Sequence, residues 1–545
     1  MFKRLKVKLN IFTITSILAG LFIIVPLLNI LVRIFERPSD VWIHIRTYLL
    51  VEYLQNTVIL ITFVALLSGL LGFFAAFTVT RFEFKGRKTL AWMLILPLAV
   101  PSYIMGYVYA DMFSFIGIVP RTLRDVGIDI RFNVMTMRSA IIIFVLTLYP
   151  YVYMLTRSAL NKQNASYIES ARLLGASKMK VLWRVVLPLA RPALVAGILL
   201  VVLETLNDYG LVAFFNIQVF SFAIFNAWFS FGDVVSAIRL SAVLMVIVFV
   251  VVFLERAVRG KRRYHLSSKT RPVKRTPLRG YQNIYPFILW GVLVFAFFIP
   301  VLYLIYLAQF SRVGFFDLEM IYLIINSLSI ALFATALIVI IAVMLANFAR
   351  GRSSSFKKSW LKITNLGYAI PGAVLAIAVN IFFINTDQIL YPIYRLFNPE
   401  TGRLVLSLSL AMLVFAYVLR FMAIGYNSIE ASYDKIGESF TEAAYALRAS
   451  KLKTLLMVDV PLIKTGLISA AIIVFIDVVK ELPLTLILRP ADYNTMASKV
   501  YEYASDEMLT EASIPALILI FISSLMVFLL THMKAKGGFT FVRKN

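Results

Sequence analysis

Five ionisable residues interrupt two strongly apolar segments of this chain, and four of them are carboxylates of the kind that bind cations. Glu204 and Asp208 lie one helical turn apart near the end of one segment. Asp477, Lys480 and Glu481 stand at i, i+3 and i+4 in the other, which places them on one face of a continuous helix. Because ionisable groups inside membrane spans are costly and usually functional, this pattern predicts an acidic lining along a path for a cation.

A second interpretation gives these residues no role in transport. Lys480 then neutralises one carboxylate, and the others lie in the headgroup zone. Asp111, near the end of another apolar segment, is a further candidate for the path. A tight site for a hard metal ion needs three or more converging oxygen donors, so the sequence leaves any metal ligand open. Cysteine is absent, which excludes thiolate sites and disulfides, and the histidines are far apart in sequence: His44, His265 and His532.

The segments that hold these charges belong to a polytopic helical membrane protein. Of the 545 residues, 61% are hydrophobic and 15% are charged, with a mean hydropathy of +0.86, whereas soluble domains carry about 25% charged residues. Apolar runs recur at the length of about 20 residues that crosses a bilayer, and the alternating segments of a β-barrel are absent. We predict twelve spans near 11–35, 56–80, 90–115, 138–156, 188–206, 237–257, 285–309, 322–349, 365–385, 404–427, 463–488 and 513–533.

The net charge of +26 is explained by topology rather than by nucleic acid. The basic residues cluster in short segments between spans, where the positive-inside rule places them. The segment 255–280 holds ten Lys or Arg against one Glu and is expected to be a solvated cytoplasmic linker. Both termini are basic and are predicted to be cytoplasmic. The N-terminal apolar run exceeds a signal-peptide core and has no small-residue cleavage site, so we expect no cleavage.

The two halves of the chain repeat one another. Glu442 follows Glu169 by 273 residues, and Pro461 follows Pro188 by the same interval. We therefore expect two parallel repeats of six spans each, as in many transporters that place a path between matching halves. The predicted division is a first repeat at 1–258 with a polar loop at 163–190, a linker at 259–283, and a second repeat at 284–545 with a polar loop at 436–463.

Each polar loop has the pattern of a short helical hairpin. The sequence S-x-x-E at 166–169 and again at 439–442 predicts a capping box at the start of a helix. Gly175 then suits a left-handed helix end, and Ser177 can cap a second helix that leads toward the membrane. Two such hairpins at equivalent places on one face predict a docking surface for a soluble partner, although either alone could be an ordinary interfacial loop.

The pattern E-x-A-x-x-x-G, followed by a proline, resembles the EAA loop of ABC importer permeases. The matching residues are Glu169, Ala171, Gly175 and Pro188 in the first loop, and Glu442, Ala443, Ala444 and Pro461 in the second. The resemblance implies that each loop is a coupling helix seated in one of two copies of an ABC ATPase subunit. Arg448 stands at the glycine position of the second loop, so a left-handed backbone there would cost about 1 kcal/mol or more.

A narrower resemblance is to the fused, two-repeat permeases of ferric-iron uptake. It rests on ETLNDYG at 204–210, KELPLTLILRP at 480–490 and VPSY at 100–103, and it covers essentially the whole chain. The resemblance implies an all-α polytopic membrane protein with the MetI-like type I ABC importer fold, located in a bacterial inner membrane. It also implies ferric iron delivered by an extracytoplasmic binding protein, and alternating access driven by a separate ATPase that uses ATP and Mg.

The chain itself is not expected to be an enzyme or to bind a cofactor. It has no G-x-x-x-x-G-K-[ST] phosphate loop and no nucleophile set. Other substrates stay open, since permeases for polyamines, thiosulfate or sulfate, and phosphonates share the loop, although these usually come as two separate chains. An ion-coupled secondary transporter, or a scaffold or channel, is the alternative from another class, and neither would need docking loops.

Overall fold

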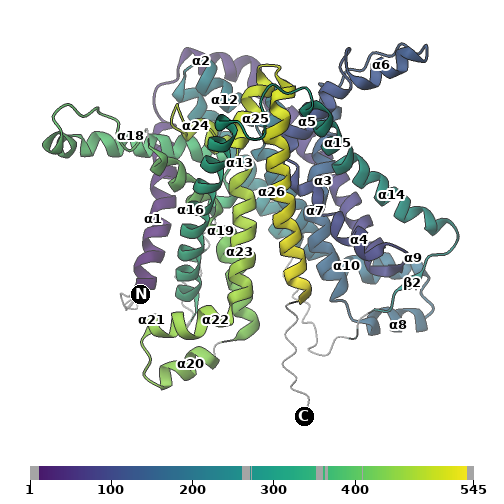
Figure 1. Cartoon of the computed structure of the whole chain (residues 1–545). Coiled ribbons are helices and arrows are strands. Elements are labelled where there is room, and N and C mark those ends of the chain that lie inside the picture. Colours follow the sequence, from purple (N-terminus) through teal and green to yellow (C-terminus); the bar gives the residue numbers. More distant parts are fainter. Residues whose placement is uncertain are drawn as a thin grey trace.

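The structure is a computed structural model in which helices run between two ends of a bundle (Figure 1). One end holds the start of α1 (Ile11–Arg33), the end of α26 (Leu509–Lys536), and the helices of both polar loops. The other end holds short helices such as α2 (Asp40–His44) and α25 (Met496–Ser505). The residues described are 11–259, 271, 273–350, 360–361, 366–407, 409–437 and 439–536.

The first half contains the following elements in chain order. After α1 and α2 come η1 (Ile45–Leu49), α3 (Leu50–Arg81), β1 (Phe82–Glu83), α4 (Arg87–Met93), η2 (Leu96–Ala99), α5 (Ser102–Met112), α6 (Ile118–Asp125), α7 (Met137–Asn161), α8 (Ala165–Leu173), α9 (Lys178–Val181), η3 (Leu182–Val186), α10 (Leu187–Asn207), α11 (Gly210–Phe214), α12 (Phe220–Phe225), η4 (Asn226–Ser230) and α13 (Val234–Arg259).

The second half follows the same plan. Its elements before α25 and α26 are β2 (Thr276–Pro277), η5 (Gly280–Asn283), α14 (Ile284–Leu293), η6 (Val294–Phe298), α15 (Ile299–Ala308), α16 (Leu318–Ala349), η7 (Leu366–Ala369), α18 (Gly372–Phe397), α19 (Leu410–Ile436), α20 (Ser439–Ala446), α21 (Lys451–Thr454), η8 (Leu455–Asp459), α22 (Val460–Leu462), α23 (Lys464–Val479) and α24 (Pro483–Leu488).

Among the described residues, ten helices are long and apolar enough to span a membrane, and two sharply bent pairs raise the number to twelve. The predicted span 90–115 is one of these pairs and bends by 88° at Val100–Pro101. Proline has no N–H and disfavours helical backbone in the residue before it, so the helix must end there. The predicted span 463–488 is also interrupted, because α23 ends at Val479.

The ninth predicted span, 365–385, differs most from the structure. Its first residue lies outside the described part of the chain, and Pro371 again separates a short helical turn from the helix that follows. That helix, α18, continues twelve residues further than predicted and runs crosswise to α1 and α16 (Figure 1). The other nine predicted spans coincide with helices. The largest differences are at the second and fifth, which belong to longer helical runs over Asp40–Arg81 and Lys178–Asn207, and at the tenth, which extends to Ile436.

Equivalent contacts confirm the repeat in three dimensions. α3, α7 and α10 pack against one another in the first half, as α16, α19 and α23 do in the second. The hydroxyl of Thr57 in α3 accepts the amide N–H of Phe220 at the start of α12 (3.2 Å). Ser327 in α16 accepts the amide N–H of Met496 at the start of α25 in the same way (2.7 Å).

The two halves exchange their first spans. α1 packs against α16 and α18 of the second half, while α15 packs against α5 of the first half as well as against α26. The hydroxyl of Tyr303 in α15 donates to Asp111 at 2.5 Å. Asp111 therefore belongs to a contact between the halves and does not line the pocket described below.

Part of the basic linker pairs with the first half of the chain. Thr276 and Pro277 pair in parallel with Phe82 and Glu83, which makes a two-stranded sheet at the end of α3. The guanidinium of Arg275 lies 3.7 Å from a carboxylate oxygen of Glu83. This stretch therefore pairs with the end of α3 while staying exposed to solvent, and residues 260–270 and 272 lie outside the described residues.

Candidate functional site

Four breaks in transmembrane helices converge between the two halves. Two are the proline breaks that precede α5 and α18. The others end α10 and α23, where the chain turns before α11 and α24. Irregular backbone at membrane depth is tolerated where it is buried in protein or lines a cavity, because its polar groups find partners there. The breaks lie at Val100–Pro101, Ile370–Pro371, Asp208–Tyr209 and Lys480–Leu482.

A cavity of about 100 Å³ lies at this meeting point. Its walls come from 98–103, 144–151 and 204–210 of the first half and from 420–421 and 477–483 of the second. All five charged residues singled out from the sequence line it, although they come from two segments 273 residues apart. The cavity is therefore built jointly by the two repeats.

Two carboxylates of the cavity also cap the short helices beside it. Oδ1 of Asp208 accepts the amide N–H of Leu211 (2.9 Å), and Oε1 of Glu481 accepts that of Leu484 (2.9 Å). These pairs are equivalent in the two repeats. The prediction that Asp477, Lys480 and Glu481 share one helix face is wrong for Glu481, because α23 ends before this residue. The Glu481 carboxylate instead accepts an amide N–H in the first turn of α24.

Arg420 is the main cavity residue that sequence reasoning missed. It lies in α19, is 3% exposed, and its Nε stands 3.7 Å from Oε2 of Glu481. Its guanidinium also donates to Oδ1 of Asn207 across the boundary between the halves (2.7 Å). An arginine inside an apolar span is itself a signal of function, so the sequence could have revealed it.

Further polar contacts cross the same boundary. The hydroxyl of Tyr368 donates to Glu204 (2.7 Å), and Lys480 donates to the carbonyl of Leu98 (3.3 Å). Lys480 also lies 3.4 Å from Asp477, an ion pair of the kind that the second interpretation of these charges includes. These contacts tie the halves together around the cavity.

The charge balance of the cavity favours a cation. Four carboxylates face two basic side chains, which leaves a formal charge of −2 when all are ionised. In the part of the chain that the structure describes, no group of three or more His, Cys, Asp or Glu is arranged to hold a metal ion. The arrangement is an acidic lining and not a preformed metal site, as suits a path that must release what enters it.

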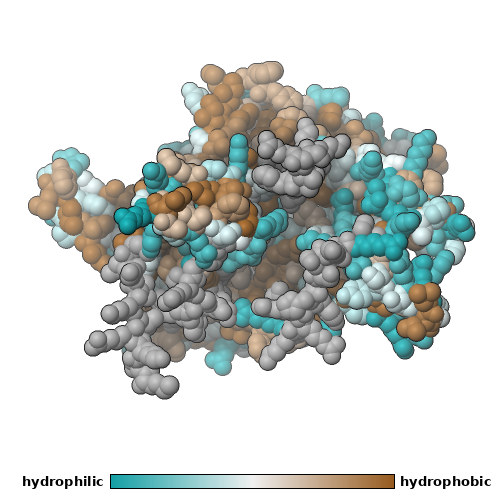
Figure 2. Space-filling model, turned by 90° about the horizontal axis from the view of Figure 1, so that it is seen from below, coloured by the Kyte–Doolittle hydropathy of each residue, from teal (hydrophilic) through white to brown (hydrophobic). Residues whose placement is uncertain are grey.

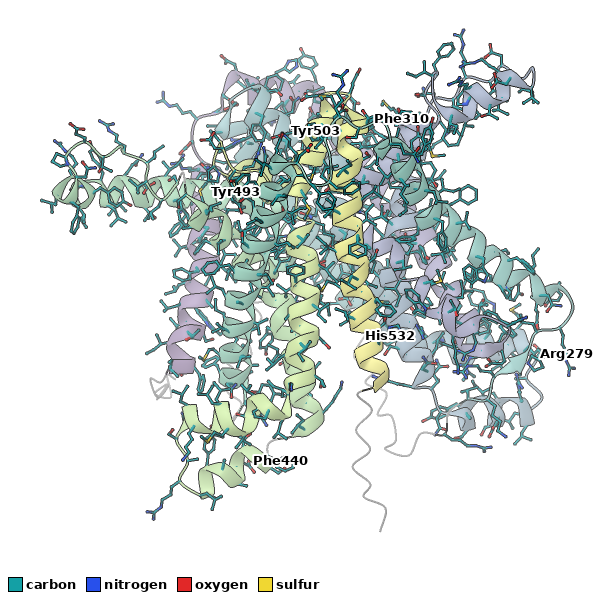
Figure 3. All side chains as sticks on the ribbon, viewed as in Figure 1. Arg279, Phe310, Phe440, Tyr493, Tyr503 and His532 are labelled. Atoms are coloured by element: carbon teal, nitrogen blue, oxygen red, sulfur yellow. The ribbon has the colours of Figure 1, made fainter. Side chains whose placement is uncertain are left out.

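Both polar loops project from the same end of the molecule (Figure 1). In Figure 3, Phe440 of the second loop lies at this end, whereas Tyr493 and Tyr503 lie at the other. Each loop presents nearly bare leucines at its tip: Leu173 and Leu174 are 88% exposed, and Leu447 is 84% exposed. These exposed leucines lie on the predicted docking surface, whose partner stays a prediction.

The first helix of each loop begins differently from the prediction. Asn164, and not Ser166, caps α8, because its side chain accepts the amide N–H of Ser166 (3.2 Å). α20 already begins at Ser439, so this serine is also not the cap, and the residue before it lies outside the described residues. The predicted cap at Ser177 is confirmed, and Ser450 makes the same contact in the second loop.

The matched residues of the two loops are mostly accessible. Glu169 lies 3.4 Å from Arg271 of the linker, and Ala171 packs partly buried against the first half. Pro188 stands in the first turn of α10. In the second loop, Glu442 and Ala443 are exposed and Ala444 is half-buried, while Pro461 lies in α22. Their role in contacting an ATPase stays a prediction.

The loops join their spans in different ways. The first runs into α10 as one continuous helix over Lys178–Asn207. In the second, Lys451–Leu462 and Lys464–Val479 meet at an angle of 80°. The bent loop is held by an ion pair between Arg350 and buried Asp459 (3.2 Å), and the hydroxyl of Thr441 donates to the same carboxylate (2.7 Å). The two loops are therefore not mechanically identical.

The residue at the end of the first helix has left-handed backbone in both loops. Gly175 has φ +78°, and Arg448 has φ +60°. The turn is therefore conserved between the repeats although the residue type is not. Arg448 carries the strain of about 1–2 kcal/mol that a side chain meets in this conformation.

Replacing Arg448 with glycine should therefore stabilise the second loop by about 1 kcal/mol, somewhat offset by the greater freedom of glycine in the unfolded chain. Hydrogen exchange of the loop amides would measure the change. Gly175→Arg is the matched control and should destabilise the first loop, since a Cβ there meets no atom within 4 Å and only the backbone is strained. Faster exchange in Arg448→Gly would contradict this account.

Comparison with known proteins agrees with this architecture. The family model of the binding-protein-dependent transport system inner membrane component matches the chain twice, at 68–264 and 338–536. The Fe(3+)-transport system permease protein FbpB 2 of Haemophilus influenzae is 28% identical over 95% of this chain and 97% of its own length. The sulfate transport system permease protein CysT of Salmonella typhimurium is 28% identical over 36% of this chain and 69% of its own.

Among solved structures, a crystal structure of a bacterial ABC transporter that imports the acidic polysaccharide alginate aligns with 16% identity and a TM-score of 0.36. That alignment covers 48% of this chain and 96% of the other. The family model occurs once in each repeat, and together the two matches span well over half of the residues. The chain therefore belongs to the family of binding-protein-dependent transport system inner membrane components.

Proposed function

We propose that the two repeats of this chain form the membrane path of an ATP-driven importer, with two ATPase subunits bound at its two polar loops. The observation that carries the proposal is that each exposed loop leads directly into a helix, α10 or α23, whose far end lines the shared cavity. A displacement of the loops is therefore transmitted along rigid helices to the contacts that hold the halves together.

The cycle that follows is alternating access. When the ATPase subunits close, they draw the two loops together. The inter-half contacts of Arg420, Tyr368 and Lys480 then have to break or exchange for the cavity to open toward the end that carries α25. The hydroxyl of Tyr501 in α25 donates to that of Tyr209 in the cavity wall (3.1 Å), so this contact is another that the proposed opening would have to break.

Ferric iron is the substrate that the cavity and the relatives favour. The lining is acidic, which suits a cation delivered by an extracytoplasmic binding protein. The ferric relative matches nearly the whole chain, whereas the sulfate relative matches about a third. A path for sulfate would use the two basic side chains of the cavity. The four carboxylates give the lining a net negative charge, which would repel sulfate.

The proposal predicts that Glu204→Gln with Asp208→Asn lowers ferric-iron uptake by tenfold or more, since about 1.4 kcal/mol of lost attraction corresponds to a factor of ten. The amide oxygens can still accept the hydrogen bonds from Tyr368 and from the amide N–H of Leu211. The bond that Ser102 donates to Asp208 would be reversed, with the new amide donating to the hydroxyl, so the fold should persist. Uptake of radiolabelled ferric iron into cells that lack the native permease would measure the effect.

Glu400→Gln is the matched control, because this carboxylate is exposed and far from the cavity lining. Unchanged iron uptake in the double variant would remove the acidic path from the proposal. Sulfate uptake that rises while iron uptake stays absent would favour the sulfate alternative.

A further inference from the structure

The distal half of α18 forms an arm that projects sideways from the bundle at the end opposite the polar loops (Figure 1). The proximal part, from Gly372, is buried in the bundle, whereas most residues after Asp387 are exposed. The chain returns along this arm to the start of α19 at Leu410. The first half has no helix of this length after its proline break, because α5 stops at Met112.

Hydrogen bonds hold the arm and the returning segment together. The Asp387 carboxylate is fully buried and accepts hydrogen bonds from three successive amides of the returning segment: Val405, Leu406 and Ser407, at 2.8–3.2 Å. The hydroxyls of Ser407 (2.6 Å) and Tyr394 (2.8 Å) donate to it as well. This clasp fixes the returning segment against one face of the helix.

The opposite face of the helix is apolar, and its side chains are exposed in the part of the chain that the structure describes. Ile389 is 75% exposed, Ile393 48%, Leu396 83% and Phe397 87%. Positions 389, 393 and 396 follow the i, i+4, i+7 spacing of a single stripe, with Pro392 between them. Asp387, Tyr391 and Tyr394 share the clasped face. The arm is therefore amphipathic, with its polar cover on one side.

The apolar face is turned toward the level of the bilayer. Figure 1 shows the returning segment on the outer side of the arm, away from the spans. Seen from the end that carries the loops, hydrophobic residues cover much of the arm (Figure 2). The arm leaves the bundle beside α1, whose outward side chains such as Leu18, Leu28 and Val32 are exposed as lipid-facing residues are.

We propose that this arm lies on the membrane surface, with its apolar stripe between the lipid headgroups and the acyl chains. Interfacial helices combine such a stripe with basic and aromatic residues at the headgroup level. The arm has these: Arg395 is exposed, and the guanidinium of Arg403 lies 5.8 Å from the ring centre of Tyr391. The arm also leaves the bundle beside α1, whose outward side chains are apolar and exposed, which favours lipid over a protein as the occupant of the stripe.

The arm connects the bilayer surface to the transport cavity. α18 is one continuous helix, and the amide N–H of Gly372 at its start donates to Oδ1 of Asn207 (2.6 Å). The same oxygen binds Arg420. Contact with lipid at one end of α18 thus fixes the position of a cavity contact at the other.

The absence of native cysteine allows a direct test with the full-length chain. Leu396→Cys and, separately, Ile389→Cys would be labelled with an environment-sensitive fluorophore and placed in vesicles of phosphatidylethanolamine and phosphatidylglycerol. We expect blue-shifted emission that is quenched by brominated lipid and protected from aqueous iodide. Glu400→Cys, at the tip beyond the stripe, is the matched control and should show iodide quenching only.

Equal iodide quenching at 389, 396 and 400 would overturn the proposal. So would protection of the stripe that develops only when a purified solute-binding protein is added, because the face would then be a protein docking site. Neither result depends on iron uptake, so the arm and the transport function can fail independently.

Discussion

Replacing Arg420 with methionine should destabilise the protein by about 3–5 kcal/mol, as removal of one partner of a buried ion pair does, and should abolish uptake. The variant leaves the Glu481 carboxylate buried without its counter-charge, since this side chain is only 6% exposed. It also removes the contact to Asn207 that joins the two halves. Methionine fills a similar volume, so the loss of stability would come from the missing charge and hydrogen bonds and not from an empty cavity.

The measurement is thermal unfolding of the purified protein in detergent, together with uptake in cells. Arg420→Met with Glu481→Gln should recover part of the stability, because it removes the stranded charge, and the coupling between the sites can be obtained from the double-mutant cycle. Arg312→Met, at an exposed arginine, is the control and should have little effect. An Arg420→Met protein as stable and active as the parent would refute the role of this contact.

Replacing Leu173, Leu174 and Leu447 with serine should abolish association with the ATPase and reduce uptake to background. Each is among the most exposed large side chains of the chain and stands at a loop tip. If these leucines enter clefts of the ATPase, the loss of each hot spot costs about 2 kcal/mol, or roughly 30-fold in affinity. The loss of binding free energy at all three leucines should therefore prevent a stable complex with the ATPase.

Co-purification of the ATPase with the tagged chain would measure association. The variant should fold normally, since the substituted side chains contact solvent in the structure. Leu318→Ser is the matched control, because Leu318 is 73% exposed and begins a helix at the opposite end. Retained ATPase binding in the triple variant would show that the loops do not couple in the way proposed.

Much of the fold could be predicted because the signals are local. Apolar runs locate the spans, and the 273-residue repeat of Glu169 and Pro188 predicts two similar halves, as the double family match shows. Ser177 caps α9 by accepting the amide N–H of Lys180, and Gly175 adopts the left-handed turn before it; both features depend only on residues close in sequence. The sequence predicts Ser166 as the cap of α8, but Asn164 makes this contact, because both residues can accept an amide N–H and only the position at which the helix begins decides between them.

The sequence predicts most of the charged residues of the candidate site, but it does not predict how they are arranged in space. Charges in apolar segments identified Glu204 and Asp477, yet nothing local shows that helix breaks bring them together. The break after Val479 has a local signal, because Lys480, Glu481 and Pro483 interrupt the apolar pattern and proline disfavours helical backbone in the residue before it, but the predicted span 463–488 runs through it. Arg420 could have been noticed as a charge in an apolar span, but its partners are Asn207 at the end of α10 and Glu481 in the break after α23, and nothing local predicts these contacts.

By itself, the sequence determined that this is a helical membrane protein of two repeats with a polar loop in each, because hydropathy and short-range hydrogen bonding are properties of neighbouring residues. The tertiary structure decided which charges meet in one cavity, which first span packs on which half, and where α18 leaves the bundle. Those features depend on contacts between residues far apart along the chain, whose free energy no local pattern encodes.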